Sequence, residues 1–118
     1  MNTVILIGYL GSDAESRTTR NNSTLTVLSL ATNRVWKDRE SGERRSQSTW
    51  HRCVTFGPTA TYAAALTKGA HVQIEGEIQN REYIAKDGAK KSVTEVRVRR
   101  LTHLNKTQKV AAPEGAAA

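Results

Sequence analysis

The chain has 118 residues, which is enough for one domain that buries a core without the help of metals or disulfides. Its single cysteine, Cys53, excludes an internal disulfide and fits a reducing compartment, and no apolar stretch approaches the roughly 20 residues of a membrane-spanning helix. The formal net charge of +7 favours a polyanionic partner over a cationic one.

The positive charge is concentrated in two segments. Residues 34–52 carry six Lys or Arg against three acidic residues, and residues 81–100 carry seven against three, while the remaining residues balance. Each segment is centred on a predicted turn, which is the footprint expected for a polyanion. A surface that only confers solubility is the alternative interpretation. An anionic membrane is disfavoured, because no basic amphipathic helix is visible.

The first predicted strand is TVILIGYL, residues 3–10. No basic lead-in precedes its apolar run, so we expect no secretory signal and a cytoplasmic protein. The four consecutive apolar residues Val4–Ile7 need cover on both faces of the strand, and a partner subunit is one way to cover the second face. Gly8 and Gly11 predict a bulge or a close backbone approach. The polar segment 12–23 is predicted to be a loop.

A charged hairpin follows, with strands predicted at 24–35 and about 46–56 around the loop DRESGE. Both tryptophans, Trp36 and Trp50, and the only phenylalanine, Phe56, lie in or beside this hairpin among its basic residues. Aromatic faces accept bases of any identity while Lys and Arg follow a phosphate backbone, so the cluster favours single-stranded nucleic acid. Burial in the core is the alternative for any one ring. Because a core excludes charged neighbours, we expect Trp36 and Trp50 to be exposed.

One helix is predicted over PTATYAAALTKG, residues 58–69. Pro58 suits its first turn and Gly69 suits its C-terminal cap. The spacing of Tyr62 and Leu66 predicts that both side chains face the core.

Two further strands are predicted at 70–83, with a kink at Gly76, and at about 92–104. The Asp-Gly pair in AKDGAKK, residues 85–91, predicts the turn between them. Residues 105–118 have too little apolar content to pack, so we expect a disordered tail.

Five strands with one helix between the third and fourth indicate an all-β OB-fold, a five-stranded Greek-key barrel. The second and third strands of this fold, with its 1–2 and 4–5 loops, form the usual binding face. The two basic segments fall on the predicted 2–3 and 4–5 hairpins. We therefore expect residues 1–104 to form an OB-fold domain that binds single-stranded nucleic acid.

Five blocks in order resemble the bacterial single-stranded DNA-binding protein family: NTVILIGYLGSDAE, LSLATNRVWKD, TWHRCVTFG, KGAHVQIEGEIQNREY and DGAKKSVTEVRV. The resemblance covers roughly residues 1–104. It implies a non-enzymatic OB-fold homotetramer, a dimer of dimers without cofactor. Such a protein coats single-stranded DNA in replication, recombination and repair, in the bacterial cytoplasm at the nucleoid.

The resemblance also implies roles for individual residues. Base-stacking positions fall on Trp36, Trp50, Phe56 and Tyr83, the last with a smaller ring where the family usually has Trp. Phosphate contacts are expected at Arg39, Arg45, Arg52, Lys68, Arg81 and Lys90. Subunit contacts are expected at His51, Val4 and Leu6.

The chain departs from the family pattern at several places. Ala14 stands where the family usually has Pro, and Tyr9 where Asn is common. The family normally carries a long tail with an acidic tip that recruits other enzymes, whereas this sequence ends in GAAA. Recruitment through such a tip is therefore not expected.

Two other classes of function compete with DNA binding. An enzyme is disfavoured because His51 and Cys53, two residues apart on one strand face, are too far apart for the imidazole to reach the thiol. His71 and His103 show no zinc-ligand spacing, and no paired carboxylates are evident, so no catalytic or metal site is expected. A protein–protein adaptor would use the same barrel without needing exposed indoles.

Overall fold

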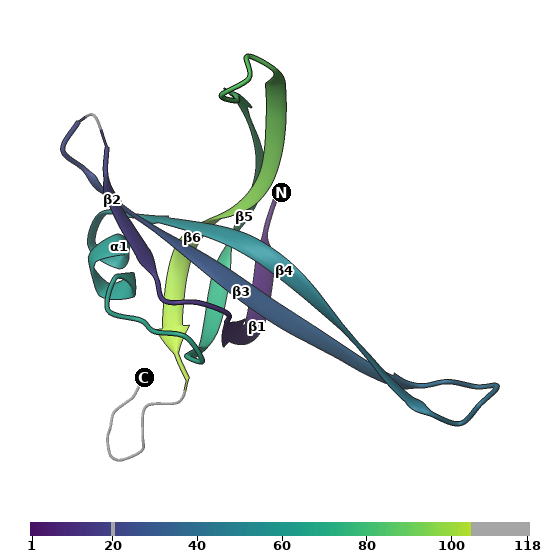
Figure 1. Cartoon of the computed structure of the whole chain (residues 1–118). Coiled ribbons are helices and arrows are strands. Elements are labelled where there is room, and N and C mark those ends of the chain that lie inside the picture. Colours follow the sequence, from purple (N-terminus) through teal and green to yellow (C-terminus); the bar gives the residue numbers. More distant parts are fainter. Residues whose placement is uncertain (20, 105–118) are drawn as a thin grey trace.

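The computed structural model describes residues 1–19 and 21–104. Its elements are, in order, β1 (Val4–Leu10), β2 (Glu15–Thr18), β3 (Thr24–Lys37), β4 (Arg44–Phe56), α1 (Gly57–Ala63), β5 (His71–Ile84) and β6 (Lys90–His103) (Figure 1). The predicted strands and the single helix are confirmed. The tail predicted at 105–118 lies outside the described residues.

Strand β1 closes the sheet into a barrel. It pairs antiparallel with β5 along its length and with β3 through Tyr9 and Leu10. The order β1-β5-β6-β4-β3 therefore returns to β1, and β4 runs parallel to β6 where Cys53 meets Val96. A five-stranded barrel with one helix between β4 and β5 confirms the predicted OB-fold layout.

Strand β2 corrects the expectation of a loop over 12–23. It pairs antiparallel with β3, from Glu15 opposite Val27 to Thr18 opposite Thr24. All four of its residues are exposed, so the segment lacks the apolar alternation by which a strand is recognised in a sequence. The strand is a polar extension beyond the barrel.

The core is aliphatic and is built mainly by β3, β4 and β5. Its fully buried side chains include Leu28, Leu30, Cys53, Val72 and Ile74. Buried residues of β3 fall on both parities, as expected for a curved strand covered on two faces.

Helix α1 is shorter than predicted. Its buried face consists of Ala60 and Ala63, whose small side chains let it approach the barrel closely. The helix ends at Ala63, so Leu66 reaches the core from the following connection. Tyr62 is exposed, and the expectation that it faces the core is wrong. Gly69, with a φ of 92°, lies in that connection and does not cap the helix.

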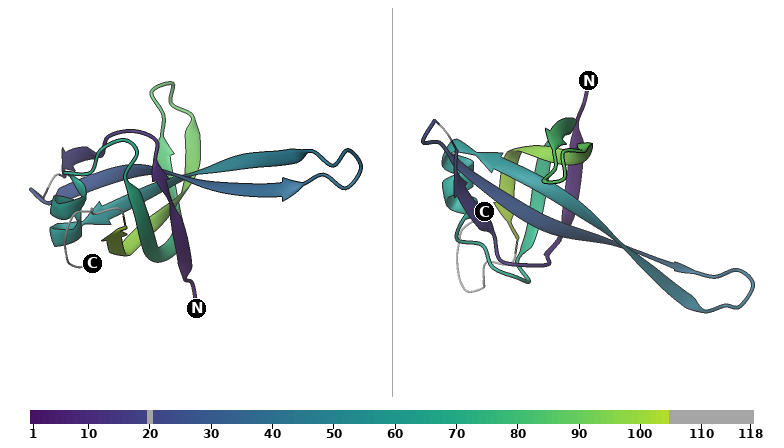
Figure 2. Two further views of the ribbon diagram at one scale, coloured as in Figure 1. Left: turned by 90° about the horizontal axis from the view of Figure 1, so that it is seen from below. Right: turned by 45° about the horizontal axis from the view of Figure 1, so that its top comes forward.

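Two long hairpins project from the barrel. Strands β3 and β4 have 14 and 13 residues, and β5 and β6 have 14 each, which exceeds the usual 3–10 residues of a strand. Their outer ends form two arms that leave the barrel in different directions (Figures 1 and 2). The predicted kink at Gly76 is present as a register shift between Glu75 and Gly76, where any Cβ would overlap the carbonyl oxygen of Arg97.

Candidate nucleic-acid interface

Four aromatic rings stand at the surface of the barrel and its arms. Trp36 and Trp50, on β3 and β4, are 37% and 60% exposed, which confirms the predicted exposure of both indoles. Phe56, at the end of β4, and Tyr83, on β5, are also exposed. Apolar rings of this size normally lose most of their surface to the core. Their exposure leaves flat faces available to a ligand.

Three of these rings lie beside a guanidinium group. Arg34 lies 5.2 Å from the ring centre of Trp36, Arg97 lies 5.1 Å from that of Phe56, and Arg81 lies 5.9 Å from that of Tyr83. These separations are within the ~6 Å of a cation–π contact. A ring face and a positive charge are therefore available together at each of these places.

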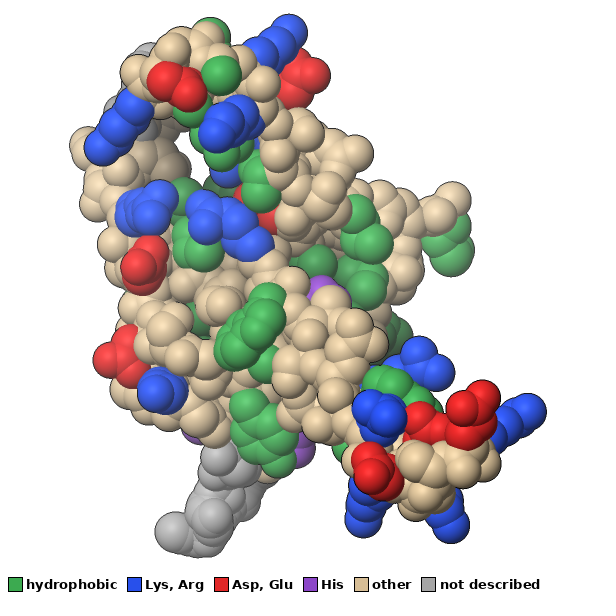
Figure 3. Space-filling view, turned by 45° about the vertical axis from the view of Figure 1, so that its right-hand side comes forward, with side chains coloured by type: hydrophobic (Ala, Val, Ile, Leu, Met, Phe, Trp, Pro, Cys, Tyr) green, Lys and Arg blue, Asp and Glu red, His purple; other side chains and the backbone are tan. Residues whose placement is uncertain are grey.

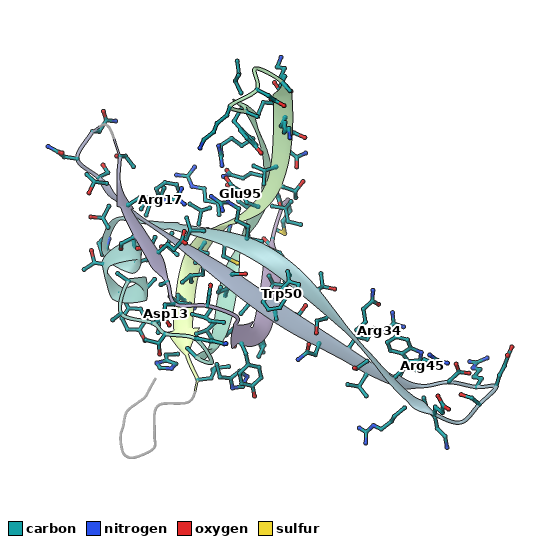
Figure 4. All side chains as sticks on the ribbon, viewed as in Figure 1. Asp13, Arg17, Arg34, Arg45, Trp50 and Glu95 are labelled. Atoms are coloured by element: carbon teal, nitrogen blue, oxygen red, sulfur yellow. The ribbon has the colours of Figure 1, made fainter. Side chains whose placement is uncertain are left out.

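The β3–β4 arm is fixed at its tip by Asp38. Its carboxylate accepts hydrogen bonds from the backbone N–H groups of Glu40 and Ser41 and from Nε of Arg45, the last at 2.8 Å. These donors, with that of Glu40 the largest influence, lower the pKa of Asp38. Arg45 lies opposite Trp36 in the hairpin, and Figure 4 shows Arg34 and Arg45 along this arm. Arg39 is exposed in the turn itself.

A buried acid lies where β4, β5 and β6 meet. Glu95 of β6 is only 3% exposed. Its Oε2 accepts a hydrogen bond from Nε of Arg52 at 3.2 Å, and its Oε1 accepts bonds from Nε of Arg81 at 3.1 Å and from Nε2 of Gln79 at 3.0 Å. Burial alone would raise the pKa of Glu95, but these donors and the charge of Arg81 outweigh it and lower the pKa. The acid is therefore charged and paired.

The six predicted phosphate contacts are not gathered in one place. Arg52 and Arg81 meet at Glu95, whereas Arg39 and Arg45 lie on the β3–β4 arm. Lys90 lies on the β5–β6 arm, 3.4 Å from the carboxylate of Glu82. Lys68 lies in the connection after α1, where its backbone N–H donates to Asp13. In Figure 3 the Lys and Arg side chains gather on both arms, with hydrophobic side chains on the surface between.

The two subunit contacts predicted on β1 lie on the inner face of the strand. Val4 and Leu6 pack partly buried against the core, so the exposed apolar face of this strand consists of Ile5, Ile7 and Tyr9. Gly8 lies on the same inner face as Val4 and Leu6, where a Cβ would overlap the carbonyl oxygen of Ala31 in β3. The assignment of Val4 and Leu6 to a subunit contact remains a prediction.

His51, the third predicted subunit contact, is half-buried on β4. Its Nε2 lies 2.9 Å from the hydroxyl of Thr32, and burial lowers its pKa. The neutral imidazole is therefore favoured in the fold.

The described residues contain little that an enzyme would use. Burial raises the pKa of the Cys53 thiol to about 12, so the reactive thiolate is suppressed. Within residues 1–19 and 21–104, no three or more His, Cys, Asp or Glu side chains are grouped to hold a metal ion. In the same part of the chain, no helix has the length and apolarity needed to cross a membrane.

Glu95, Arg97 and Arg34 were not singled out by the sequence as site residues. Glu95 and Arg97 share a face of β6, so strand parity was available as a signal. Their contacts to β4 depend on the parallel β4–β6 pairing, whose partners are about 43 residues apart in the chain. No local pattern reports such a pairing.

The fold and the site define a class of protein, an OB-fold with exposed rings set among arginines. Residues 1–104 match the model of the Single-strand binding protein family, and the chain belongs to that family. Proteins named single-stranded DNA-binding protein from Rickettsia conorii and Rickettsia felis are each 43% identical to it over 98 residues. These matches cover 81% of this chain and 64% of each relative, so the chain spans less than two thirds of their length.

Two solved structures have the same fold. The Plasmodium falciparum SSB in complex with ssDNA has a TM-score of 0.78 and 27% identity, over 89% of this chain and 96% of that chain. A deletion mutant of the single-stranded DNA-binding protein from Thermus aquaticus has a TM-score of 0.76 and 33% identity, over 90% of this chain and 51% of that chain.

Proposed function

We propose that this protein binds single-stranded DNA without sequence preference, stacking unpaired bases on Trp36, Trp50, Phe56 and Tyr83. The observation that carries the proposal is the exposure of these four rings, three of them with a guanidinium group within 6 Å of the ring centre. Membership of the single-strand binding protein family supports it. So does the bound ssDNA named for the Plasmodium structure.

The binding combines stacking with neutralisation of phosphates. Every base has a π-face, so stacking on a ring does not depend on base identity. Lys and Arg side chains displace counterions from the phosphate backbone, which makes affinity fall as salt rises. The bases of a duplex are already stacked and offer these rings nothing to contact. The protein therefore distinguishes single strands from duplexes without reading a sequence.

The positive side chains fall at four places, three of them along the proposed path. Arg39 and Arg45 contact phosphates beside Trp36 on the β3–β4 arm. Arg52 and Arg81 do so beside Tyr83, and Lys90 does so on the β5–β6 arm. Lys68, in the connection after α1, contributes least.

A titration with oligo-dT tests this function. Intrinsic tryptophan fluorescence is expected to be quenched by oligo-dT, and the quenching is expected to reverse on addition of salt. With a dye-labelled oligo-dT, Trp36→Ala and Trp50→Ala are each expected to weaken binding, whereas Tyr62→Ala, which removes an exposed ring on α1, is not. Absence of quenching in the wild type would favour the protein–protein adaptor.

The proposal includes assembly into a homotetramer through the outer face of β1 and a contact at His51. The exposed side chains of Ile5, Ile7 and Tyr9 form an apolar face that a second copy of the chain would cover. Tyr9 extends this face toward β5 by stacking on His71, with ring centroids 4.4 Å apart. In a bacterial cytoplasm the assembly would coat single strands during replication, recombination and repair.

Mass measurement in solution tests the assembly separately. Ile7→Lys is expected to reduce the mass from that of a tetramer, because burying an unpaired charge at the contact is costly. Ile84→Lys places the same charge at an exposed isoleucine of the β5–β6 arm and is expected to leave the mass unchanged. A monomeric wild type would contradict the assembly and leave the binding proposal standing.

A further inference from the structure

We propose that Glu95 is a positioning residue, whose buried carboxylate holds the guanidinium groups of Arg52 and Arg81 together as one paired phosphate site. The inference rests on the proposed function. It adds a role for an acidic residue inside an interface whose partner is itself an anion.

The three side chains come from three strands. Glu95 lies on β6, in the middle, with Arg52 on β4 at one side and Arg81 on β5 at the other. Each arginine donates through Nε, and the two bonds go to different carboxylate oxygens, at 3.2 Å and 3.1 Å. Gln79 also donates to Glu95, so the carboxylate is held from several directions.

The carboxylate of Glu95 is buried while both guanidinium groups remain partly exposed, as a phosphate site requires. The Glu95 side chain is 2% exposed, whereas those of Arg52 and Arg81 are 38% and 48% exposed. Within residues 1–19 and 21–104, no hydrogen bond is made by the terminal amino groups of these two arginines. The carboxylate is thus covered, and the outer edges of both guanidinium groups face solvent and can donate to phosphate oxygens.

The pair lies between two of the exposed rings. A hollow of about 290 Å³ is lined by Arg52, Arg81, Tyr83 and Val93. A second, of about 260 Å³, includes Trp50, Arg52 and Glu95 in its lining. Arg52 belongs to both hollows. A phosphate bound here has a stacking ring on either side.

Glu95 would act by lowering the cost of arranging the arginines. Two guanidinium groups repel each other, and a free arginine side chain loses rotamer freedom when it binds. A carboxylate between them offsets the repulsion and fixes both before DNA arrives, and the trio keeps one positive charge in excess. Simple charge counting predicts the opposite, that an acid in this interface only repels phosphates.

The substitution Glu95→Gln separates these two views by the sign of its effect. If Glu95 positions the two arginines, Glu95→Gln should bind oligo-dT about tenfold more weakly, which is the loss expected for one charge-assisted hydrogen bond. It also predicts a salt slope of log K smaller by about 0.7 for each phosphate that is no longer neutralised. Charge counting predicts equal or tighter binding. Glu82→Gln is the matched control, since Glu82 is an exposed acid paired with Lys90, and it should bind at least as tightly as the wild type.

Each outcome decides the inference. Equal or tighter binding by Glu95→Gln overturns it, and so does weaker binding with an unchanged salt slope, because that indicates a general structural effect. If circular dichroism shows that this variant is unfolded, Arg81→Lys decides instead. Lysine keeps the charge but has no Nε, so about tenfold weaker binding is expected, and wild-type affinity overturns the inference. A wild type that does not bind oligo-dT removes the proposed function itself.

Discussion

The backbone of Gly11 lies against the edge of the Trp50 indole, so that a Cβ on residue 11 would overlap Cζ3 and Cη2 of the ring. The N–H of Gly11 donates to the carbonyl oxygen of Ser29 at 2.9 Å, which ties this backbone to β3. Gly11 is not among the glycines with positive φ, so space and not backbone conformation requires it here. The backbone of Gly11 thus bounds the Cζ3–Cη2 edge of the indole.

The substitution Gly11→Ala is expected to displace the Trp50 ring. The displacement should weaken oligo-dT binding by about 1 kcal/mol, the lower end of the 1–3 kcal/mol per base known for single-strand-binding proteins of this fold. In a Trp36→Phe background Trp50 is the only tryptophan, so its emission maximum reports the displacement directly. Unchanged emission together with unchanged affinity would contradict the role of Gly11 in bounding the ring.

Arg52 and Lys68 are expected to differ in their effect on salt dependence. Arg52 lies between two rings, whereas Lys68 lies in the connection after α1 beside Asp13. Arg52→Gln should reduce the slope of log K against log salt by about 0.7, the value for one phosphate of a single strand left without its cation. Lys68→Gln should leave the slope unchanged. Equal slopes for the two variants would show that the position of a cation on the surface does not affect the salt dependence of binding.

The buried hydroxyl of Thr26 is expected to contribute to stability and not to binding. It donates to the carbonyl oxygen of Ala60 at 2.7 Å and thereby attaches α1 to β3. Thr26→Val removes this bond, while the carbonyl keeps the backbone N–H of Ala64 at 3.0 Å, and should cost about 0.5–1.5 kcal/mol of unfolding free energy. Thr24→Val, at an exposed position of the same strand, should change it by less than about 0.5 kcal/mol. Urea titrations at one protein concentration measure the unfolding free energies of both variants. A change in the oligo-dT affinity of Thr26→Val would contradict the expectation that this hydroxyl contributes to stability and not to binding.

Glu95 is also expected to make stability depend on pH. Its pKa in the fold is below the ordinary 4.5, so the unfolded chain binds this proton more tightly than the folded one. The contribution of Glu95 is therefore complete above pH about 4.5 and is lost as the pH falls through the lower folded-state pKa. Urea unfolding from pH 3 to 7 should show the difference between the wild type and Glu95→Gln shrinking toward pH 3. Parallel curves would contradict this.

Cys53 is expected to react with thiol reagents only when the fold opens. The side chain is fully buried, and its pKa is raised to about 12, so neither access nor thiolate is available at pH 8. Labelling should be complete at once in denaturant and should proceed in native buffer no faster than unfolding. Rapid labelling of the native protein would show that β4 opens locally at this residue.

Local patterns in the sequence predicted the two arms well. Turn residues such as Asp87 and Gly88, with strand-forming residues on either side, specify a hairpin without information from the rest of the chain. Exposure of Trp36 and Trp50 followed from their charged neighbours. Both features depend on residues close in sequence, and both are confirmed by the structure.

Features that depend on distant parts of the chain could not be predicted in the same way. Strand β2 is polar throughout and is a strand only because β3 offers it a free edge. Glu95 has the sequence surroundings of a surface acid, and only the meeting of β4, β5 and β6 makes it a buried partner of two arginines. The orientation of Val4 and Leu6 depends on the pairing of β1 with β5 and β3, which an unbroken apolar run does not reveal.

The divergence of the two arms bears on the stiffness of any ligand that uses all four rings. Trp36 lies on the β3–β4 arm and Tyr83 on the β5–β6 arm, so a polymer that visits both must curve around the barrel (Figure 2). The longest dimension of the molecule is 51 Å, whereas a DNA duplex stays nearly straight over about 500 Å. A pliable single strand would follow the proposed path at little cost, whereas bending a duplex over so short a distance would cost several kcal/mol.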